Sequence, residues 1–184
     1  FQRKNVATVV GEVFKTMGFT DFEFVNVKGP DPEREYIVQY RESDFDFVSR
    51  LLEEQGIFYY FRHEDGKHTM VLSDSADAYK VCDKKEVSFR GSGAFKDYDD
   101  DLTAWEHHYE FRSGRVSTND FNFETPQRPV NGMQRTLLKV PQMDKFELFD
   151  YPGRFRTPAE GRHVAMVRMQ AEEAEFDVVR GGSS

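Results

Sequence analysis

The sequence predicts an α+β protein that is mainly β: an antiparallel β-barrel with a smaller αβ subdomain and flanking helices. Two helical segments in the first third of the chain begin and end at residues typical of helix ends. A turn containing glycine joins two extended runs in the same region. Beyond residue 102 extended runs with short connections dominate, and that pattern is typical of antiparallel sheets and barrels.

The first predicted helix begins after Asn5, whose side chain can accept from the free backbone N–H groups of the first turn. Apolar residues then recur at three- and four-residue spacing; they are Val6, Val9, Val10, Val13, Phe14 and Met17. Gly18 supplies the left-handed residue that commonly ends a helix. Extended segments are predicted at 22–27 and 36–40, with the turn residues of 28–32 between them.

A second helix is predicted to begin at Ser43, because this hydroxyl can accept from the backbone of Asp46, whose carboxylate favours the positive end of a helix. It runs to Gln55, and Gly56 turns the chain into an aromatic strand, Ile57-Phe-Tyr-Tyr-Phe-Arg. The predicted buried side consists of Phe47, Val48, Leu51 and Leu52.

A β-hairpin is predicted next, because Glu64-Asp-Gly-Lys contains an Asp-Gly pair that tolerates positive φ angles. The return strand covers 68–72. Helix, strand and hairpin together indicate a compact αβ unit. The segment 80–98 is polar and interrupted by glycines, so we place a domain boundary near residue 80. Residues 1–80 are predicted to form the αβ subdomain, and residues 81–184 a segment of the barrel with a C-terminal helix.

Long extended runs characterise this second part of the chain. They are predicted at 103–112, at 115–124 after a Ser113-Gly114 turn, at 134–140 and at 145–149. These runs are the basis for predicting an antiparallel sheet or barrel.

The C-terminal helix has the clearest start, with Thr157 as cap, Pro158 in the first helical position and Glu160 completing a capping box. It is predicted to reach about Glu175, and a strand follows at 176–179. The predicted buried stripe consists of Val164, Val167, Ala171 and Ala174.

Composition excludes several functions. The formal net charge is -8 and the basic residues are scattered, so nucleic acid is not expected as a partner. A single cysteine, Cys82, excludes an internal disulfide framework and a site built from several thiolates. No segment has the length of a membrane span, and no signal peptide is recognisable. The chain begins with Phe1 and ends after an apparent strand start, so we expect a fragment that continues beyond residue 184.

Histidine pairs occur twice. His63 and His68 flank the predicted hairpin turn, where polar residues are expected without any metal. His107 and His108 are consecutive in a predicted strand, so they should point to opposite faces and not share an ion. Neither pair is assigned as a metal site.

Acidic clusters are equally weak candidates. Asp97-Tyr-Asp-Asp-Asp begins like a calcium loop, but Leu102 stands where glycine is needed and His108 where a bidentate glutamate belongs. Glu53-Glu54 and Glu172-Glu173 are predicted on exposed helical faces. Nucleophile, phosphate-loop and metal-protease motifs do not occur. No catalytic residue, metal ligand or cofactor-binding residue is therefore assigned, and no cofactor is expected.

The aromatic strand after Gly56 favours assembly. Ile57, Tyr59 and Phe61 should face one way, and Phe58, Tyr60 and Arg62 the other. Large apolar residues on both faces predict that both are covered, one by a helix and the other by further protein or another subunit.

Residues 36–61 carry a family resemblance: they read Tyr36-Ile-Val-Gln-Tyr-Arg-Glu-Ser-Asp-Phe-Asp-Phe-Val-Ser-Arg-Leu-Leu-Glu-Glu-Gln-Gly-Ile-Phe-Tyr-Tyr-Phe. This run closely resembles the signature of VgrG proteins, the spike proteins of bacterial type VI secretion. Further matches follow in the same order and cover nearly the whole chain: Glu64-Asp-Gly-Lys-His-Thr-Met-Val-Leu-Ser-Asp, Asn119-Asp-Phe-Asn-Phe-Glu-Thr-Pro, Tyr151-Pro-Gly-Arg-Phe and Ala159-Glu-Gly-Arg-His-Val-Ala.

The resemblance implies a fold and a mechanical role. Proteins of this family resemble phage tail hubs, with a trimeric base of paired antiparallel β-barrels, and this chain would be a middle part of that base. The implied partners are two further copies, the tube-forming ring protein and baseplate components, with a tip protein and effectors bound through regions this chain lacks. The implied location is the bacterial cytoplasm during assembly, followed by secretion when the sheath contracts.

Two alternatives remain. The first is the tail hub of a contractile prophage particle, which has nearly the same fold. The second, more distant, is a carbohydrate-active enzyme using Asp99, Asp101 or His108. The resemblance supplies no catalytic residue, so we expect a structural protein and not an enzyme.

Overall fold

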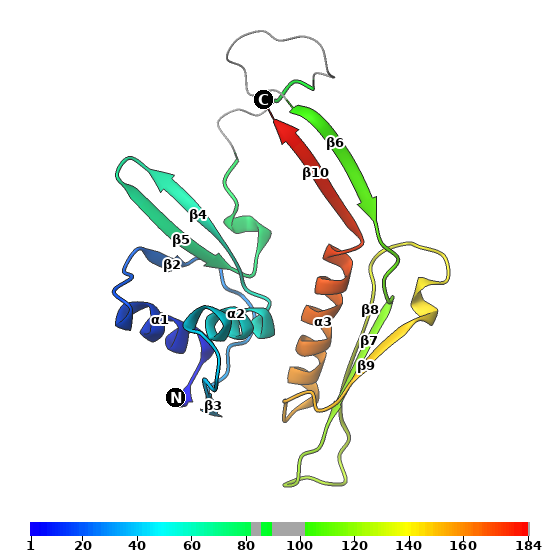
Figure 1. Ribbon diagram of the computed structural model, residues 1–184. Helices are drawn as coiled ribbons and strands as arrows, with labels where there is room; N and C mark the ends of the chain where they lie inside the picture. The colour runs from blue at the N-terminus through cyan, green and yellow to red at the C-terminus, as the bar shows by residue number, and fades with distance from the viewer. Residues whose placement is uncertain (82–85, 90–101, 184) are drawn as a thin grey trace. The chain divides into compact units, whose positions relative to one another are not determined.

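The computed structural model describes residues 1–81, 86–89 and 102–183. The chain forms two compact units, Phe1–Tyr79 and Lys80–Ser184, called here the N-terminal and C-terminal units. Their helices and strands are labelled in Figure 1. No helix in these described ranges combines the length and the apolar character needed to cross a bilayer.

The N-terminal unit contains two helices packed beside short strands (Figure 1). Its elements are β1 (Gln2–Lys4), α1 (Val6–Thr16), β2 (Phe22–Phe24), β3 (Arg34–Tyr36), α2 (Asp44–Gln55), β4 (Phe58–Glu64), β5 (Lys67–Ser73) and the 3-10 turn η1 (Ala76–Ala78).

Both predicted helices of this unit are confirmed, together with their capping residues. Asn5 Oδ1 accepts from the Thr8 N–H at 3.0 Å, and Ser43 Oγ accepts from the Asp46 N–H at 3.1 Å. Gly56 ends α2 with a φ of 71°, a conformation that carries little cost only for glycine. Capping of α1 has a second contributor that the sequence analysis missed, because the Asp31 carboxylate accepts from the first two helical N–H groups at 2.9 Å.

The main sheet of the unit has the strand order β2-β5-β4. The predicted hairpin is confirmed: β4 and β5 pair antiparallel from Phe58↔Ser73 to Glu64↔Lys67. β2 pairs parallel with β5 and is shorter than the predicted 22–27 segment. The predicted strand at 36–40 is wrong in extent, because β3 ends at Tyr36, where it pairs with the unpredicted strand β1.

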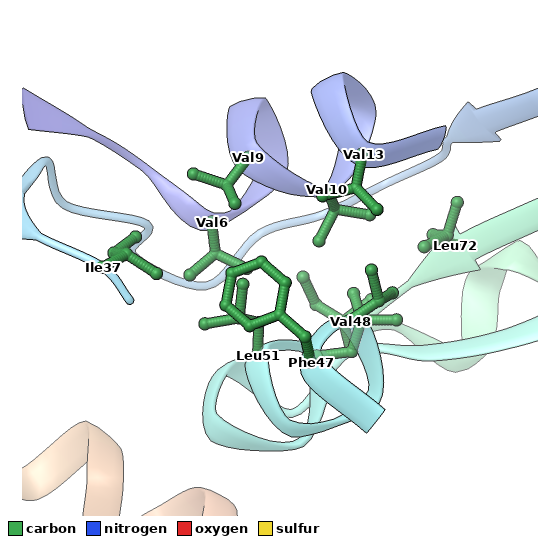
Figure 2. Packing of buried hydrophobic residues seen from close by; sticks show 11 residues of the cluster. Val6, Val9, Val10, Val13, Ile37, Phe47, Val48, Leu51 and Leu72 are labelled. Atoms are coloured by element: carbon green, nitrogen blue, oxygen red, sulfur yellow. The ribbon is translucent and has the colours of Figure 1, made fainter. Parts of the chain in front are cut away.

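Eleven buried residues form the core of this unit, and Figure 2 shows the valines of α1 facing Phe47, Val48 and Leu51 of α2. The cluster consists of Val6, Val9, Val10, Val13, Ile37, Phe47, Val48, Leu51, Leu52, Ile57 and Leu72. Four of its members are the residues predicted as the buried side of α2, so that prediction is confirmed.

The C-terminal unit is built from strands and one long helix. Its elements are β6 (Leu102–Tyr109), β7 (Arg115–Asp120), β8 (Val130–Arg135), the 3-10 turn η2 (Met143–Lys145), β9 (Glu147–Asp150), α3 (Pro158–Ala174) and β10 (Asp177–Ser183). Strand β8 begins and ends earlier than the predicted 134–140 segment, and β10 continues beyond the predicted 176–179 segment.

The Ser113-Gly114 turn was predicted to join two long extended runs, but β6 and β7 do not pair with each other. β6 pairs antiparallel with β10, whereas β7 pairs with β8 and β9. The reason lies at Gly114, whose N–H donates to the carbonyls of Met143 and Phe146 at 3.1 Å. A side chain at this glycine would overlap the Met143 backbone, so the glycine permits close approach of another segment instead of reversing the chain.

The predicted closed antiparallel barrel is not found among the described residues, whose sheets contain two or three strands each. Two of the pairings are also parallel, β2 with β5 and β7 with β9. The connection between β8 and β9 carries the chain across β7, so β9 runs in the direction of β7 on its other side. The fold is mixed α+β and mainly β, with open sheets.

Helix α3 lies on the β8-β7-β9 sheet and is followed directly by β10 (Figure 1). Its capping residue is confirmed, since Thr157 Oγ1 accepts from the Glu160 N–H at 3.3 Å. The predicted buried stripe is wrong: the residues that α3 buries are Gly161, Ala165 and Met169, whereas Ala171 and Ala174 are exposed. Gly132 of β8 fixes this rotation, because a Cβ there would overlap the Gly161 carbonyl.

Candidate interaction surfaces

The edge strand β4 carries exposed aromatic side chains. Tyr59 and Phe61 are 39% and 52% exposed, and their rings pack edge to face at 6.0 Å. Their cross-strand partners are Leu72 and Met70, which belong to the core or pack against it. Directly paired residues lie on one face of a sheet, so the apolar face of the sheet extends to its edge beyond the part that the helices cover.

The opposite face of β4 is closed within this chain. The rings of Phe58 and Tyr60 lie 5.0 and 5.5 Å from that of Tyr79, and Tyr60 Oη donates to the Ala78 carbonyl at 2.6 Å. Within this chain the face of Tyr59 and Phe61 is left open, so its coverage by another subunit stays a prediction. An edge strand with an exposed aromatic row is typical of a surface that pairs with other protein.

The hairpin brings His63 and His68 together, although the sequence analysis treated them only as residues flanking a turn. Their Nδ1 atoms are 2.7 Å apart and their ring centroids 4.8 Å apart. The His63 ring stacks on Phe61 with a centroid distance of 6.4 Å. One ring must donate and the other accept across this short contact.

The second histidine pair behaves as predicted, with the rings on opposite faces of β6. His107 lies beside Tyr109, with ring centroids 5.7 Å apart, and its Nδ1 is 2.9 Å from an oxygen of Asp177. His108 Nε2 is 3.5 Å from the carboxylate of Glu106. Each ring therefore has its own acidic neighbour.

Three of the paired glutamates are engaged in structural contacts, which corrects the prediction of solvated helical faces for them, whereas Glu53 is exposed as predicted. Glu54 binds Arg34 at 2.6 Å and Arg50 at 3.4 Å. Glu172 accepts two bonds of 3.1 Å from Arg112. The Glu173 carboxylate accepts from the Thr136 hydroxyl at 2.7 Å and from the Leu137 N–H.

Sequence reasoning missed the cluster around Arg50 in the signature segment. Its guanidinium binds Glu42 at 2.6 Å and the Val38 carbonyl at 3.2 Å, and it lies 5.4 Å from the centre of the Phe47 ring. The hydrogen bond from Arg50 holds the pKa of Glu42 below its usual value, and the same bond raises the pKa of Arg50. Only the four-residue spacing of Arg50 and Glu54 could have indicated this cluster.

Several candidates lie outside the described residues: Cys82 and the calcium-loop-like run 97–101, with Asp99 and Asp101 of the enzyme hypothesis. His108, the third residue of that hypothesis, lies on β6. Among the residues that the structure describes, no group of three or more His, Cys, Asp or Glu side chains could hold a metal ion.

A second exposed surface is the ribbon formed by β6 and β10. Trp105 and Tyr109 are 53% and 66% exposed, and they follow one another along one face together with His107. A two-stranded ribbon is marginally stable in isolation. Its aromatic face and open edges are therefore a surface suited to further strands or another subunit.

These open sheets and uncovered aromatic faces describe a strand-rich α+β domain whose surfaces suit assembly with other protein. Its fold resembles that of phage tail proteins. A prophage MuSo2 43 kDa tail protein from Shewanella oneidensis matches with a TM-score of 0.56 at 12% identity, over 97% of this chain and 47% of that one. A tail protein from Neisseria meningitidis MC58 matches with a TM-score of 0.56 at 9% identity, over 97% and 50%.

Residues 1–184 match the phage tail baseplate hub (GPD) family, and the chain belongs to this family. The type VI secretion system spike protein VgrG1b of Pseudomonas aeruginosa is 34% identical over 98% of this chain and 24% of its own length. VgrG1c of the same organism is 34% identical over 98% and 25%, and the actin cross-linking toxin VgrG1 of Vibrio cholerae is 31% identical over 92% and 15%. The chain spans about a quarter of the length of the first two relatives.

Proposed function

We propose that this chain is part of the base of a type VI secretion spike of the VgrG kind, in which three copies of the full-length protein form a trimeric hub. Support comes from the spike proteins at 34% identity over almost the whole chain. The observation that carries the proposal is the uncovered aromatic face of β4, because Tyr59 and Phe61 lie on an open sheet edge. An obligate interface buries such residues.

The proposal assigns the two parts of the chain to the hub. Residues 1–80 form the αβ subdomain of the base, and residues 81–184 form a segment of its antiparallel barrel. The open β8-β7-β9 sheet and the β6-β10 ribbon are parts of barrels that other strands of the assembled hub complete. Support comes from their unpaired edges, since a barrel removes the edges that an open sheet exposes.

The function is mechanical in this proposal. The trimer caps the tube of ring proteins and contacts the baseplate, while a tip protein and effectors are carried by other regions of the spike. It assembles in the cytoplasm and leaves the cell when the sheath contracts. The domain itself catalyses no reaction, and its packing and interfaces transmit force.

The prophage tail hub is the weaker candidate. The tail proteins with the same fold are 9% and 12% identical to this chain, whereas the spike proteins are 34% identical. The aromatic surface residues required for trimerisation serve either assembly, so sequence similarity is what favours the spike.

Replacing Tyr59 and Phe61 by serine in the full-length spike tests the proposal. We expect the trimer of the double variant to dissociate at protein concentrations at least about tenfold higher than those at which the unsubstituted trimer dissociates, because buried aromatic residues dominate interface energies. Analytical ultracentrifugation measures this difference. Export of the tube ring protein should fall in parallel. The control is Phe19→Ser, which removes a 63% exposed ring elsewhere. An unchanged trimer in the double variant contradicts the proposal.

A further inference from the structure

The tip of the β4-β5 hairpin brings two imidazoles within hydrogen-bonding distance of each other. Asp65 and Gly66 form the loop, Glu64 pairs with Lys67, and His63 pairs with His68. Both histidines are exposed, so a hydrated ion can reach them. Their Nδ1 atoms lie 2.7 Å apart.

The surrounding residues hold this pair in place without occupying it. His63 stacks on Phe61, and the register of the hairpin keeps the two rings opposite each other. The adjacent charged residues have other partners: Glu64 accepts from Arg62 at 3.2 Å, and Lys67 Nζ lies 3.6 Å from Asp21. Two imidazoles on paired residues of a hairpin can serve as the two arms of one chelate.

The ligand type narrows the choice of metal, because imidazole suits copper, nickel and zinc. With metal–nitrogen bonds of about 2.0 Å, two neighbouring ligands of a square-planar ion are about 2.8 Å apart, and those of a tetrahedral ion about 3.3 Å. The observed 2.7 Å is the hydrogen-bond distance of the ion-free pair, so the rings must turn before both lone pairs can face one ion. Cu(II) and Ni(II) prefer a square-planar geometry with nitrogen ligands, and Cu(II) binds more tightly than the other divalent first-row ions.

We propose that His63 and His68 bind one Cu(II) ion through their Nδ1 atoms, with water in the remaining positions. In the ion-free pair one Nδ1–H donates to the other Nδ1. When the ion binds, that ring moves its proton to Nε2, so both Nδ1 lone pairs face the metal. The charge state of each ring and the oxidation state of the copper are unchanged. The bound ion ties the ends of β4 and β5 together beside Tyr59 and Phe61.

Titration of the 184-residue chain with Cu(II), followed by calorimetry and electron paramagnetic resonance, tests the proposal. Every variant carries Cys82→Ser, because a thiolate also binds copper and can reduce it. We expect one site with a tetragonal, nitrogen-coupled spectrum. His63→Asn and His68→Asn should each weaken binding at least about tenfold, since one arm of the chelate is lost.

The matched controls are His107→Asn and His108→Asn, which remove one imidazole each from β6. Both should bind Cu(II) as tightly as the Cys82→Ser parent. Unchanged affinity in a His63→Asn, His68→Asn double variant overturns the proposal, and so does an equal loss in the His107→Asn control. If an asparagine variant does not fold, the Cys82→Ser parent is titrated with Cu(II) and followed by NMR. Cu(II) should broaden the amide resonances of residues 61–70 before those of residues 105–109. The reverse order overturns the proposed site.

Discussion

The two units of this chain bury their apolar residues very differently. Eleven buried residues form the core cluster of the N-terminal unit, whereas the cluster between α3 and its sheet consists of Val116, Ala165 and Met169 among the described residues. The C-terminal unit also buries Val130, Met143 and Phe155, but among the described residues it exposes more large apolar side chains than the N-terminal unit, including Trp105, Tyr109, Phe111, Phe121, Phe123 and Leu137. The comparison indicates one unit stabilised by its own core and another that depends more on surfaces outside it.

The packing of α3 explains this difference in physical terms. A Cβ at Gly132 would overlap the Gly161 carbonyl, and a Cβ at Gly161 would overlap the Phe155 ring. Such contact depends on shape and dispersion more than on the area of apolar surface buried. The hydrophobic contribution, at about 25 cal/mol per Å², is therefore concentrated in the N-terminal unit.

The largest effect is expected from Phe47→Ala in the N-terminal unit. Phe47 is fully buried and stacks on Phe1 with a centroid distance of 5.8 Å. Removing a buried phenylalanine ring costs about 3–5 kcal/mol. Hydrogen exchange should accelerate in α1, α2 and β5 and remain unchanged in α3. Equal acceleration in α3 would show that the two units unfold together, and it would contradict the conclusion that the N-terminal unit is stabilised by its own core.

A smaller loss of stability, this time in the C-terminal unit, is expected from Gly132→Ala. The added Cβ overlaps the Gly161 carbonyl, so α3 must shift away from β8 at a cost of about 1–3 kcal/mol. Chemical denaturation followed by hydrogen exchange in α3 measures it. The control is Gly181→Ala, whose Cβ would lie 3.4 Å from the nearest atom, the Ala104 carbonyl oxygen. Similar losses of stability in both variants would show that the contact between Gly132 and Gly161 has no special role.

The smallest effect concerns pH and the Arg50 cluster. The hydrogen bond from Arg50 keeps the pKa of Glu42 in the folded protein below its usual value of 4.5. A lowered pKa contributes stability that is fully present above the usual value and is lost as the pH falls through the folded value. Glu42→Gln should therefore reduce stability at neutral pH and flatten its decline below about pH 4.5.

Denaturation midpoints between about pH 6 and pH 3 measure this slope. Glu147→Gln provides the counterpart in the C-terminal unit, because a hydrogen bond from Ser117, with a contribution from Arg115, lowers the pKa of that carboxyl. Exposed Glu53 is the neutral control. If the stability of the Glu42→Gln variant falls with decreasing pH as steeply as that of the unsubstituted chain, the Arg50 bond contributes nothing to folding.

Local signals account for most of what could be predicted. The capping residues Asn5, Ser43 and Thr157 and the glycine after α2 mark helix ends through bonds within one turn of the chain. The Asp65-Gly66 loop sets the hairpin register, and that register already places His63 opposite His68. The short Nδ1 contact was therefore accessible from the sequence, although it was not predicted.

Strand pairing in the C-terminal unit was not accessible in the same way. β6 pairs with β10, and β9 runs parallel to β7, because contacts between distant segments select among several extended runs of similar composition. The predicted stripe on α3 was wrong for this reason, and the described residues by themselves form no closed barrel. The Arg50–Glu42 bond and the Asp31 cap also depend on loops that return to a helix.

By itself the sequence determined the capped helices, the hairpin and the buried side of α2, because each depends on backbone bonds or periodicity within a few residues. Only the tertiary structure decided which strands pair, where the glycines let α3 approach its sheet, and which aromatic face of β4 is left open. These outcomes depend on which distant surfaces fit together, and local patterns carry little information about that fit.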